Sequence, residues 1–414
     1  MWPGVTVKKL EVNANLQGPL RDLKVLDLSR LLAGNFLSFH LAEMGAEILK
    51  IEDTRHWDPL RDFTSNDVDV TWKILSRNKK SVALNFTTSE AGRDILLKLV
   101  REASVLIENF KPGDMEKFGL SPDYLLDINP DLVIVRISGW GQDGPYSHKP
   151  GFGTLVEAAS GFAAKTGFPD SGPLLPNLGL ADMITGVTGA FAVLSAVRNV
   201  EVSGGEGQVI DLSLLDSIVS FLGADPGVCQ CTGKPIPRLG NRGEVAAPRN
   251  LYRSSDGHYI AMSASMQSMT ERLFNAIGRP ELIDDPKFIN NEERVKNAEE
   301  LDEIIGGFIG ERSYKENLKF FEENKVTAGP LYDALEILDD PHVKERGVYV
   351  EMDDPEVGSL PVPNVTARLS KTPGGVRSLA PKYGEHTQEV LGSLGVAAEE
   401  LNTLIAEGTV KCIS

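Results

Sequence analysis

Short runs of β-branched residues alternate with longer helical segments, and this alternation is the feature that most limits the possible folds. The first cycle consists of the extended run VLDLS, the helical run AGNFLSFHLAEMG and the extended run EILKIE. Further cycles follow as SVALNF, SEAGRDILLKLVREA, SVLIENF and LVIVRIS. Parallel neighbouring strands require a crossover connection, and helices of this length supply one. The pattern therefore predicts an α/β fold with a parallel sheet covered by helices.

Length and a change of composition both indicate two domains. A chain of 414 residues exceeds the size at which one hydrophobic core usually stops growing. The segment after Gly223 is rich in proline and glycine, and beyond it a hairpin is predicted with its turn at Asp256-Gly257. We predict a large domain that starts with residues 1–225, a smaller α+β domain over 226–330, and a final segment over 331–414.

The charge balance argues against polyanionic partners. The net charge of −17 disfavours binding to nucleic acid or to an anionic membrane, because both require a basic surface. The N-terminal run MWPGVTVKKLEV has no apolar signal core, so a cytoplasmic protein is expected. The three cysteines, Cys229, Cys231 and Cys412, match neither a disulfide set nor a zinc pattern and are expected to be reduced thiols.

Asp182 carries the one charged side chain between Ser171 and Val197, in the run LLPNLGLADMITGVTGAFAVLSAV. The apolar stretch after it is shorter than the ~20 residues of a membrane span, so a buried helix is expected. Aspartate is a favoured N-cap residue, and a carboxylate can also act as a nucleophile. Both interpretations of Asp182 stay open on its own surroundings.

A glycine pattern after the last predicted strand imitates a dinucleotide fingerprint. Gly139, Gly141 and Gly144 have the spacing G-x-G-x-x-G. The fingerprint requires a helix to begin at the third glycine, but Pro145 follows it directly. Binding of a nicotinamide or flavin cofactor is therefore not expected.

Two basic clusters stand out against the acidic background. An ordinary solvated turn would explain either of them. However, Asn109 and Phe110 end a predicted parallel strand, and ligands of open α/β sheets bind at that edge. Two basic loops there would neutralise the phosphates of a nucleotide-like ligand. The clusters are Arg77, Lys79 and Lys80, and Lys111 and Lys117.

Several segments, taken in order, resemble the class III CoA-transferases, the family of the formyl-CoA and carnitine CoA-transferases. The similar segments are VLDLSRLLAG, LAEMGAEILKIE, NKKSVALNF, LIENFKPGDMEKFGL, INPDLVIVRISGWGQDGPY, GLADMITGVTGA, GEGQVIDLSLLD and, near the end, GEHTQEVLGSLG.

The resemblance implies a Rossmann-like large domain formed by both chain ends, an inserted small domain, and an interlocked homodimer. It also implies that Asp182 is a covalent nucleophile for CoA transfer to a small carboxylic acid. Coenzyme A is then a substrate, and no metal or redox cofactor is expected.

The CoA-contacting positions carry over residue by residue. Leu31 and Leu32 match the pair near the thioester end of CoA, and Asn109 with Phe110 matches the E-N-F segment. The remaining matches are basic: Arg77 and Lys79 in the S-R-N-K-K-S turn, and Lys117 near the nucleotide phosphates.

The sequence also departs from relatives. Asp53 stands where formyl-CoA transferase has a basic residue, and the glycine-run lid of that enzyme is absent. The related α-methylacyl-CoA racemases are an alternative, but they need a histidine where this chain has Phe152, and His148 lies four residues too early. A non-catalytic acyl-CoA-binding protein is a further alternative. His386 is expected to be structural.

Two groups of residues are candidates for contacts with the reacting acids. The N–H groups of a glycine-rich loop, near Gly139 and Gly141 or over 240–243, would stabilise an oxyanion. Arg242 and Arg136 would meet the second carboxylate of a dicarboxylic acid, although each would equally serve as an ordinary ion-pair partner.

Overall fold

The computed structural model describes residues 7–413, which fold into two compact units. Unit 1 contains the chain up to Phe162, Leu175–Ala224, and the chain from Pro341 onward, and unit 2 contains Ala163–Leu174 and Asp225–Asp340. The predicted boundary at 225/226 lies one residue from the observed one. The return to the first unit occurs at 341 rather than 331, and the passage of 163–174 through unit 2 was not predicted.

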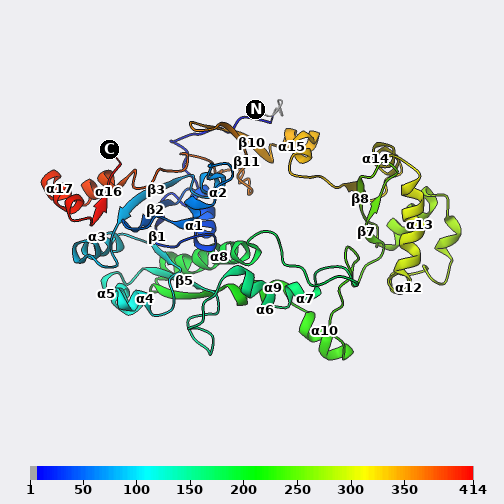
Figure 1. Cartoon of the computed structure of the whole chain (residues 1–414), viewed down its shortest axis with the longest axis horizontal. Coiled ribbons are helices and arrows are strands. Elements are labelled where there is room, and N and C mark those ends of the chain that lie inside the picture. The colour runs from blue at the N-terminus through cyan, green and yellow to red at the C-terminus, as the bar shows by residue number, and fades with distance from the viewer. Residues whose placement is uncertain (1–6, 414) are drawn as a thin grey trace. The chain divides into compact units, whose positions relative to one another are not determined.

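A seven-stranded sheet forms the centre of unit 1, in the order β12-β3-β2-β1-β4-β5-β6 (Figure 1). All pairs are parallel except that β12 runs antiparallel to β3. The predicted parallel α/β sheet is therefore confirmed. Its strands are β1 (Lys24–Asp27), β2 (Glu47–Glu52), β3 (Lys79–Leu84), β4 (Val105–Glu108), β5 (Val133–Ser138), β6 (Gln208–Ser213) and β12 (Val410–Lys411).

Helices cover both faces of this sheet, because each parallel pair is joined by a crossover. The helices of unit 1 before the insertion are α1 (Ala33–Glu43), α2 (Val70–Leu75), α3 (Glu90–Val100), α4 (Asp114–Lys117), α5 (Pro122–Ile128), α6 (Gly153–Ala159), α8 (Leu180–Ser203) and α9 (Leu214–Leu222), with the 3-10 turn η1 (Pro59–Asp62). After the insertion come α15 (Pro341–Arg346), the hairpin β10 (Tyr349–Asp354) and β11 (Gly358–Pro363), α16 (Thr387–Ser393) and α17 (Ala398–Ala406).

The helix α8 packs along α1 on one face of the sheet (Figure 1). A Cβ atom at Gly189 would lie 2.4 Å from the buried Leu37 side chain of α1, so glycine is what allows the two helices to approach. By length and composition alone α8 could also cross a membrane. One such helix is weak evidence for a membrane span. Its buried residues Ala181 and Val193 belong to the core between the helices and the sheet.

Unit 2 is a smaller α+β body with its own core. The predicted hairpin is confirmed, because β7 and β8 pair antiparallel on either side of Asp256-Gly257, and β9 extends the sheet. Its core includes Phe274, Ile305 and Phe321. The elements of unit 2 are α7 (Phe162–Lys165), of which Phe162 belongs to unit 1, α10 (Asp225–Thr232), β7 (Arg249–Arg253), β8 (Tyr259–Ser263), α11 (Gln267–Ala276), η2 (Pro280–Ile283), α12 (Asn291–Lys296), α13 (Ala298–Gly310), α14 (Tyr314–Glu323), β9 (Ala328–Pro330) and η3 (Glu336–Asp339).

Candidate active site

The sheet order of unit 1 places the candidate site. The strand order runs outward in one direction from β1 and in the other from β4, so the loops that leave these two adjacent strands diverge. The loop after β1 and the loop after β4 are held to each other by a double hydrogen bond. The Arg30 N–H donates to Asn109 Oδ1 at 2.8 Å, and Asn109 Nδ2 donates to the Arg30 carbonyl at 2.7 Å. This edge is where ligands bind in open α/β sheets.

Asp182 lies at this edge, in the first turn of α8. The N-cap position of α8 is Gly179, and it has no side-chain cap. The interpretation of Asp182 as an N-cap is therefore wrong, because the helix begins two residues before it. The backbone N–H groups of Asp182 itself and of Ala33, at the start of α1, lower the pKa of the Asp182 carboxylate.

Two cavities meet at Asp182. The first, which we call the Asn109 cavity, has a volume of about 370 Å³ and includes Asn109, Arg30, Lys111 and Lys149 among its lining residues. The second, the Asn177 cavity, also measures about 370 Å³ and includes Asn177 and Thr154. Both cavities are lined by the same three residues at their boundary, which are Leu31, Phe152 and Asp182. A carboxylate at this boundary is open to reactants from two sides.

Glu157 is a second carboxylate beside Asp182 that the sequence analysis missed. It is buried on α6, and its Oε1 accepts a hydrogen bond from the Ala181 N–H at 3.1 Å. Burial and the negative charge of Glu157 raise the pKa of Asp182 to about 6, against the lowering effect of its two N–H donors. No spacing rule relates these two residues, so only the fold reveals the pair.

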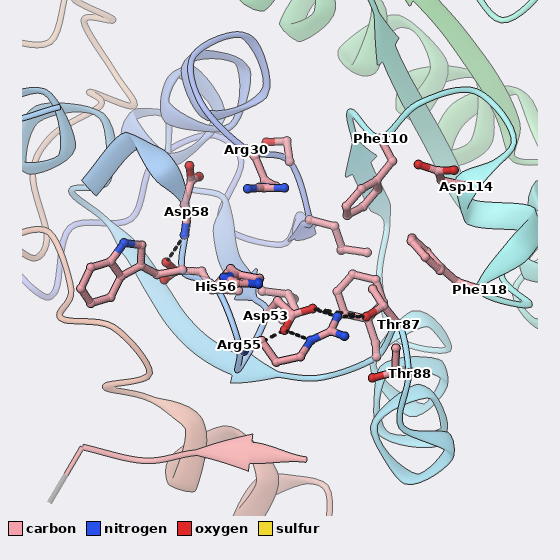
Figure 2. A pocket seen from close by; sticks show the side chains of 16 residues that line it. Arg30, Asp53, Arg55, His56, Asp58, Thr87, Thr88, Phe110, Asp114 and Phe118 are labelled. Carbon is pink, nitrogen blue, oxygen red and sulfur yellow. Dashed lines mark hydrogen bonds and ion pairs between the residues drawn. The ribbon is translucent and has the colours of Figure 1, made fainter. Parts of the chain in front are cut away.

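A third pocket, of about 430 Å³, lies beside the Asn109 cavity at the ends of β1 to β4 (Figure 2). We call it the Arg55 pocket. Arg55 donates to both carboxylate oxygens of Asp53, at 2.9 and 2.7 Å, and to Thr87 Oγ1 at 2.6 Å. Burial alone would raise the pKa of Asp53, but the hydrogen bonds and charge of Arg55 hold it below its usual range. Arg30 and His56 also line this pocket.

Aromatic rings form the opposite part of the Arg55 pocket. Phe110 and Phe118 pack edge to face with centroids 5.6 Å apart, and Phe86 lies 6.2 Å from Phe110 in the same arrangement. In Figure 2 the Phe110 and Phe118 side chains lie on one side of the pocket, away from the Asp53 and Arg55 pair. The pocket therefore combines flat apolar surface with cationic groups.

The structure corrects the expectation that Arg77 and Lys79 contact phosphates. The Arg77 side chain is fully buried, pairs with Glu43 and lies over the Phe39 ring. Lys79 is also fully buried, and its Nζ donates to the backbone and side-chain oxygens of Asn35 at 3.1 and 3.0 Å. Neither the Lys79 ammonium nor the Arg77 guanidinium is open to a ligand, because both groups bind buried acceptors inside the domain.

The remaining basic candidates have protein partners as well. Lys117 is exposed on α4 and pairs with Asp114 at 2.7 Å. Arg136 on β5 pairs with Glu108 and Glu116, both at 2.9 Å. The ion-pair alternative for Arg136 is therefore what the structure shows.

In unit 2, Arg242 pairs with Asp302 at 2.8 Å and with Glu299 at 2.9 Å. Arg242 is therefore an ion-pair partner, which was the alternative to a contact with a substrate carboxylate. His386 is structural as predicted, since its Nδ1 accepts a hydrogen bond from the Ser81 N–H at 3.3 Å.

The glycine candidates for an oxyanion contact differ from each other. Gly139 lines the Asn109 cavity directly after β5. The N–H of Gly141 already donates to Ser138 Oγ at 2.9 Å, so this group is not free to bind an oxyanion. Of the two, Gly139 keeps its place in the candidate site.

The fold and the site define a class of proteins with a doubly wound α/β domain and a partly buried aspartate at its switch point. The CoA-transferase family III model matches residues 20–387. Succinyl-CoA–D-citramalate CoA-transferase of Chloroflexus aurantiacus is 35% identical over 396 residues, which cover 95% of this chain and 98% of that protein. Human succinyl-CoA:glutarate CoA-transferase is 31% identical, over 94% of this chain and 88% of its own.

A solved structure shows the same fold. The crystal structure of a CaiB/BaiF family protein from Brucella suis matches with a TM-score of 0.79 and 30% identity, and the match covers 91% of this chain and all of that one. The chain belongs to CoA-transferase family III.

Gly153 provides a direct test of the geometry around Asp182. A Cβ atom at Gly153 would lie 2.4 Å from Asp182 Oδ2, so Gly153→Ala must displace the carboxylate. A displacement of about 1 Å at a reacting group can cost about 100-fold in rate, and we expect a loss of that order in CoA transfer.

The control is Gly392→Ala on α16, where a Cβ atom would meet nothing within 4 Å. Both variants should fold, as circular dichroism would check, and only the first should lose activity. Full activity in folded Gly153→Ala would contradict this account of the carboxylate.

Proposed function

We propose that this protein transfers CoA from an acyl-CoA donor to a small carboxylic acid through covalent intermediates on Asp182. The observation that carries this proposal is the position of Asp182 at the boundary of two cavities. The Asn109 cavity offers the cationic side chains of Arg30, Lys111 and Lys149 to a thioester substrate. Among residues 7–413, the other has no cationic side chain in its lining and offers Thr154 and Asn177 to an acyl group.

The chemistry needs only a carboxylate and the thiol of CoA. The ionised Asp182 attacks the thioester carbonyl, which forms an acyl-aspartyl anhydride and releases the CoA thiolate. The thiolate attacks the aspartyl carbonyl, which gives an aspartyl-CoA thioester and frees the donor acid. The acceptor carboxylate then displaces the thiolate to form a new anhydride, and thiolate attack on its acyl carbonyl yields the new acyl-CoA and Asp182. The scheme balances without a metal or redox cofactor.

We assign the CoA nucleotide to the Arg55 pocket and its pantetheine arm to the Asn109 cavity. Arg30 lines both spaces, as does Phe110. Arg30 and Arg55 are the cations we propose for the phosphates, with Lys111 along the arm. Leu31, Leu32 and Asn109 keep the roles that the sequence suggested, and Lys117 contributes charge from the rim.

The relatives' names narrow the substrates. Several are succinyl-CoA-dependent, with citramalate, malate or glutarate as the other acid. We therefore propose succinyl-CoA as donor and a dicarboxylic or hydroxy acid as acceptor, and a screen of such pairs would identify the acceptor. The protein is proposed to work in the cytoplasm, a reducing compartment that suits its three free cysteines.

Substitution of the nucleophile tests the covalent mechanism. Asp182→Ala should abolish CoA exchange and leave the fold intact, because the proposed acyl link forms on the Asp182 carboxylate. In the wild type, incubation with acyl-CoA and hydroxylamine should modify Asp182, as peptide mass spectrometry would detect.

Two results would contradict the proposal. Retained turnover in Asp182→Ala would exclude the aspartyl intermediate, and an unmodified wild type with intact acyl-CoA would indicate a binding protein. Solvent deuterium at the α-carbon of a 2-methylacyl-CoA would instead indicate a racemase, and we expect none.

The pH dependence of acylation tests the role of Glu157. Only ionised Asp182 is nucleophilic, so the acylation rate should rise with pH to a plateau, with its midpoint near pH 6, the value to which the Asp182 pKa is raised. Glu157→Gln removes a negative charge that raises this pKa, and the midpoint should move to lower pH. Stopped-flow acylation with acyl-CoA alone would measure both profiles.

The matched control is Glu116→Gln, which removes a carboxylate that pairs with Arg136. Its midpoint should equal that of the wild type. An unchanged midpoint in Glu157→Gln would show that the two carboxylates do not interact.

The helices α8 and α9 expose an apolar surface that supports the proposed homodimer. Phe191 is 75% exposed and Phe221 is 67% exposed. Apolar side chains that are exposed together on one surface mark interaction sites, so we propose these two helices as the interface. We expect light scattering to give twice the chain mass of 45.0 kDa.

Phe191→Asp should weaken this dimer, because a charge would be buried at the interface. Tyr124→Asp, at an exposed ring on α5, is the control and should remain dimeric. A monomeric wild type at micromolar concentration would contradict the proposal.

A further inference from the structure

Four charged side chains are buried together beneath the loop that follows β1. Asp27, Lys50, Asp58 and Lys79 have side-chain exposures of 0 to 1%, and we call them the buried tetrad. Lys50 Nζ lies 3.0 Å from Asp58 Oδ2 and 3.4 Å from Asp27 Oδ1, and Lys79 Nζ lies 3.5 Å from Asp27 Oδ2. The tetrad contains two positive and two negative groups.

Stability alone does not account for this arrangement. The cost of removing charges from water often exceeds the attraction between them, and apolar residues of similar volume would stabilise a core as well. The contacts of the tetrad with the loop that follows β1 give it a second role.

Asp58 of the tetrad and the neighbouring Asn35 hold Leu31 from both sides. The Leu31 N–H donates to Asp58 Oδ1 at 2.9 Å. The Leu31 carbonyl accepts from Asn35 Nδ2 at 2.6 Å, and the same amide donates to Asp58 Oδ2 at 2.7 Å. Lys79 in turn donates to Asn35 Oδ1 at 3.0 Å.

Leu31 needs this support because its backbone is strained. Its φ of +63° lies in the left-handed region that a leucine rarely adopts. Its side chain stands at the boundary of the two cavities beside Asp182. Two residues further on, Ala33 lines the Asn109 cavity together with Asp182, and its N–H lowers the pKa of that carboxylate.

We infer that the buried tetrad, with Asn35, is a positioning network for the reaction: it fixes Leu31 in its strained conformation and so places the Leu31 side chain and the Ala33 N–H against Asp182. The network touches no substrate and acts through the loop. This inference rests on the proposed transfer through Asp182.

The test compares two members of this network with a buried ion pair in another part of unit 1. Asp58→Asn removes the charge that faces Lys50, and Asn35→Ala removes the amide that holds the Leu31 carbonyl without creating an unpaired carboxylate. The control is Glu43→Gln, which breaks the equally buried pair with Arg77 at the other end of α1. Thermal midpoints, kcat, KM for acyl-CoA and the pH profile of acylation are measured for each full-length variant.

We expect Asp58→Asn and Asn35→Ala to lose at least tenfold in kcat, with KM for acyl-CoA changed less than threefold. Their acylation midpoint should move to higher pH, because a loosened Ala33 N–H stabilises ionised Asp182 less. Glu43→Gln should lower the thermal midpoint and keep kcat within twofold of the wild type.

Two results would overturn the inference. One is a folded Asn35→Ala with wild-type kcat and pH profile, a variant that decides the matter even where Asp58→Asn fails to fold. The other is an equal loss of kcat in all three variants at equal loss of thermal midpoint. Failure of the proposed function is distinguishable, because then the wild type itself would not transfer CoA or Asp182→Ala would retain transfer.

Discussion

The site depends on the switch point of the parallel sheet, where the strand order reverses between β1 and β4. Two adjacent strands send their chains to opposite sides, so a space opens at their carboxyl ends. The double hydrogen bond between Arg30 and Asn109 ties the two diverging loops together across this space. The Asn109 and Asn177 cavities, which meet at Asp182, are both bordered by the first loop, because Leu31 belongs to it, and α8 packs on the helix α1 that follows it.

Asp182 shows how the fold gives up stability for reactivity. Its pKa is raised to about 6, so the folded chain binds the proton more tightly than the unfolded chain does. The resulting stabilisation is fully present below the ordinary pKa of about 3.8 and is lost as pH rises through 6. At neutral pH the fold therefore holds an ionised carboxylate at a cost. The same surroundings make that carboxylate a more basic nucleophile than one in water.

The sequence predicted what local patterns determine. Alternating runs identified the strands and helices of the parallel sheet. The lone charge of Asp182 left its role open, and only the resemblance to the class III CoA-transferases made it the candidate nucleophile. The sequence did not predict that Arg77 and Lys79 are buried, because their partners Glu43 and Asn35 lie on α1, far away in sequence. Glu157 was missed for the same reason.

Short or irregular elements were also beyond the sequence patterns. The two-residue β12 carries no periodicity, although it closes one edge of the sheet. The segment 163–174 joins unit 2 through contacts distant in sequence, such as the hydrogen bond from the Gly240 N–H to the Gly167 carbonyl at 2.8 Å. Such pairings depend on the assembled fold.

Asp53 illustrates how a departure in sequence is resolved in structure. An acidic residue at the end of β2 would repel a phosphate if it stood alone. Here it holds Arg55 through two hydrogen bonds, and Thr87 fixes the same guanidinium. The pair is close to neutral, so it presents oriented N–H donors rather than net positive charge. Under the proposed function, attraction of CoA then falls to Arg30 and Lys111, whereas Arg55 fixes the orientation of what they attract.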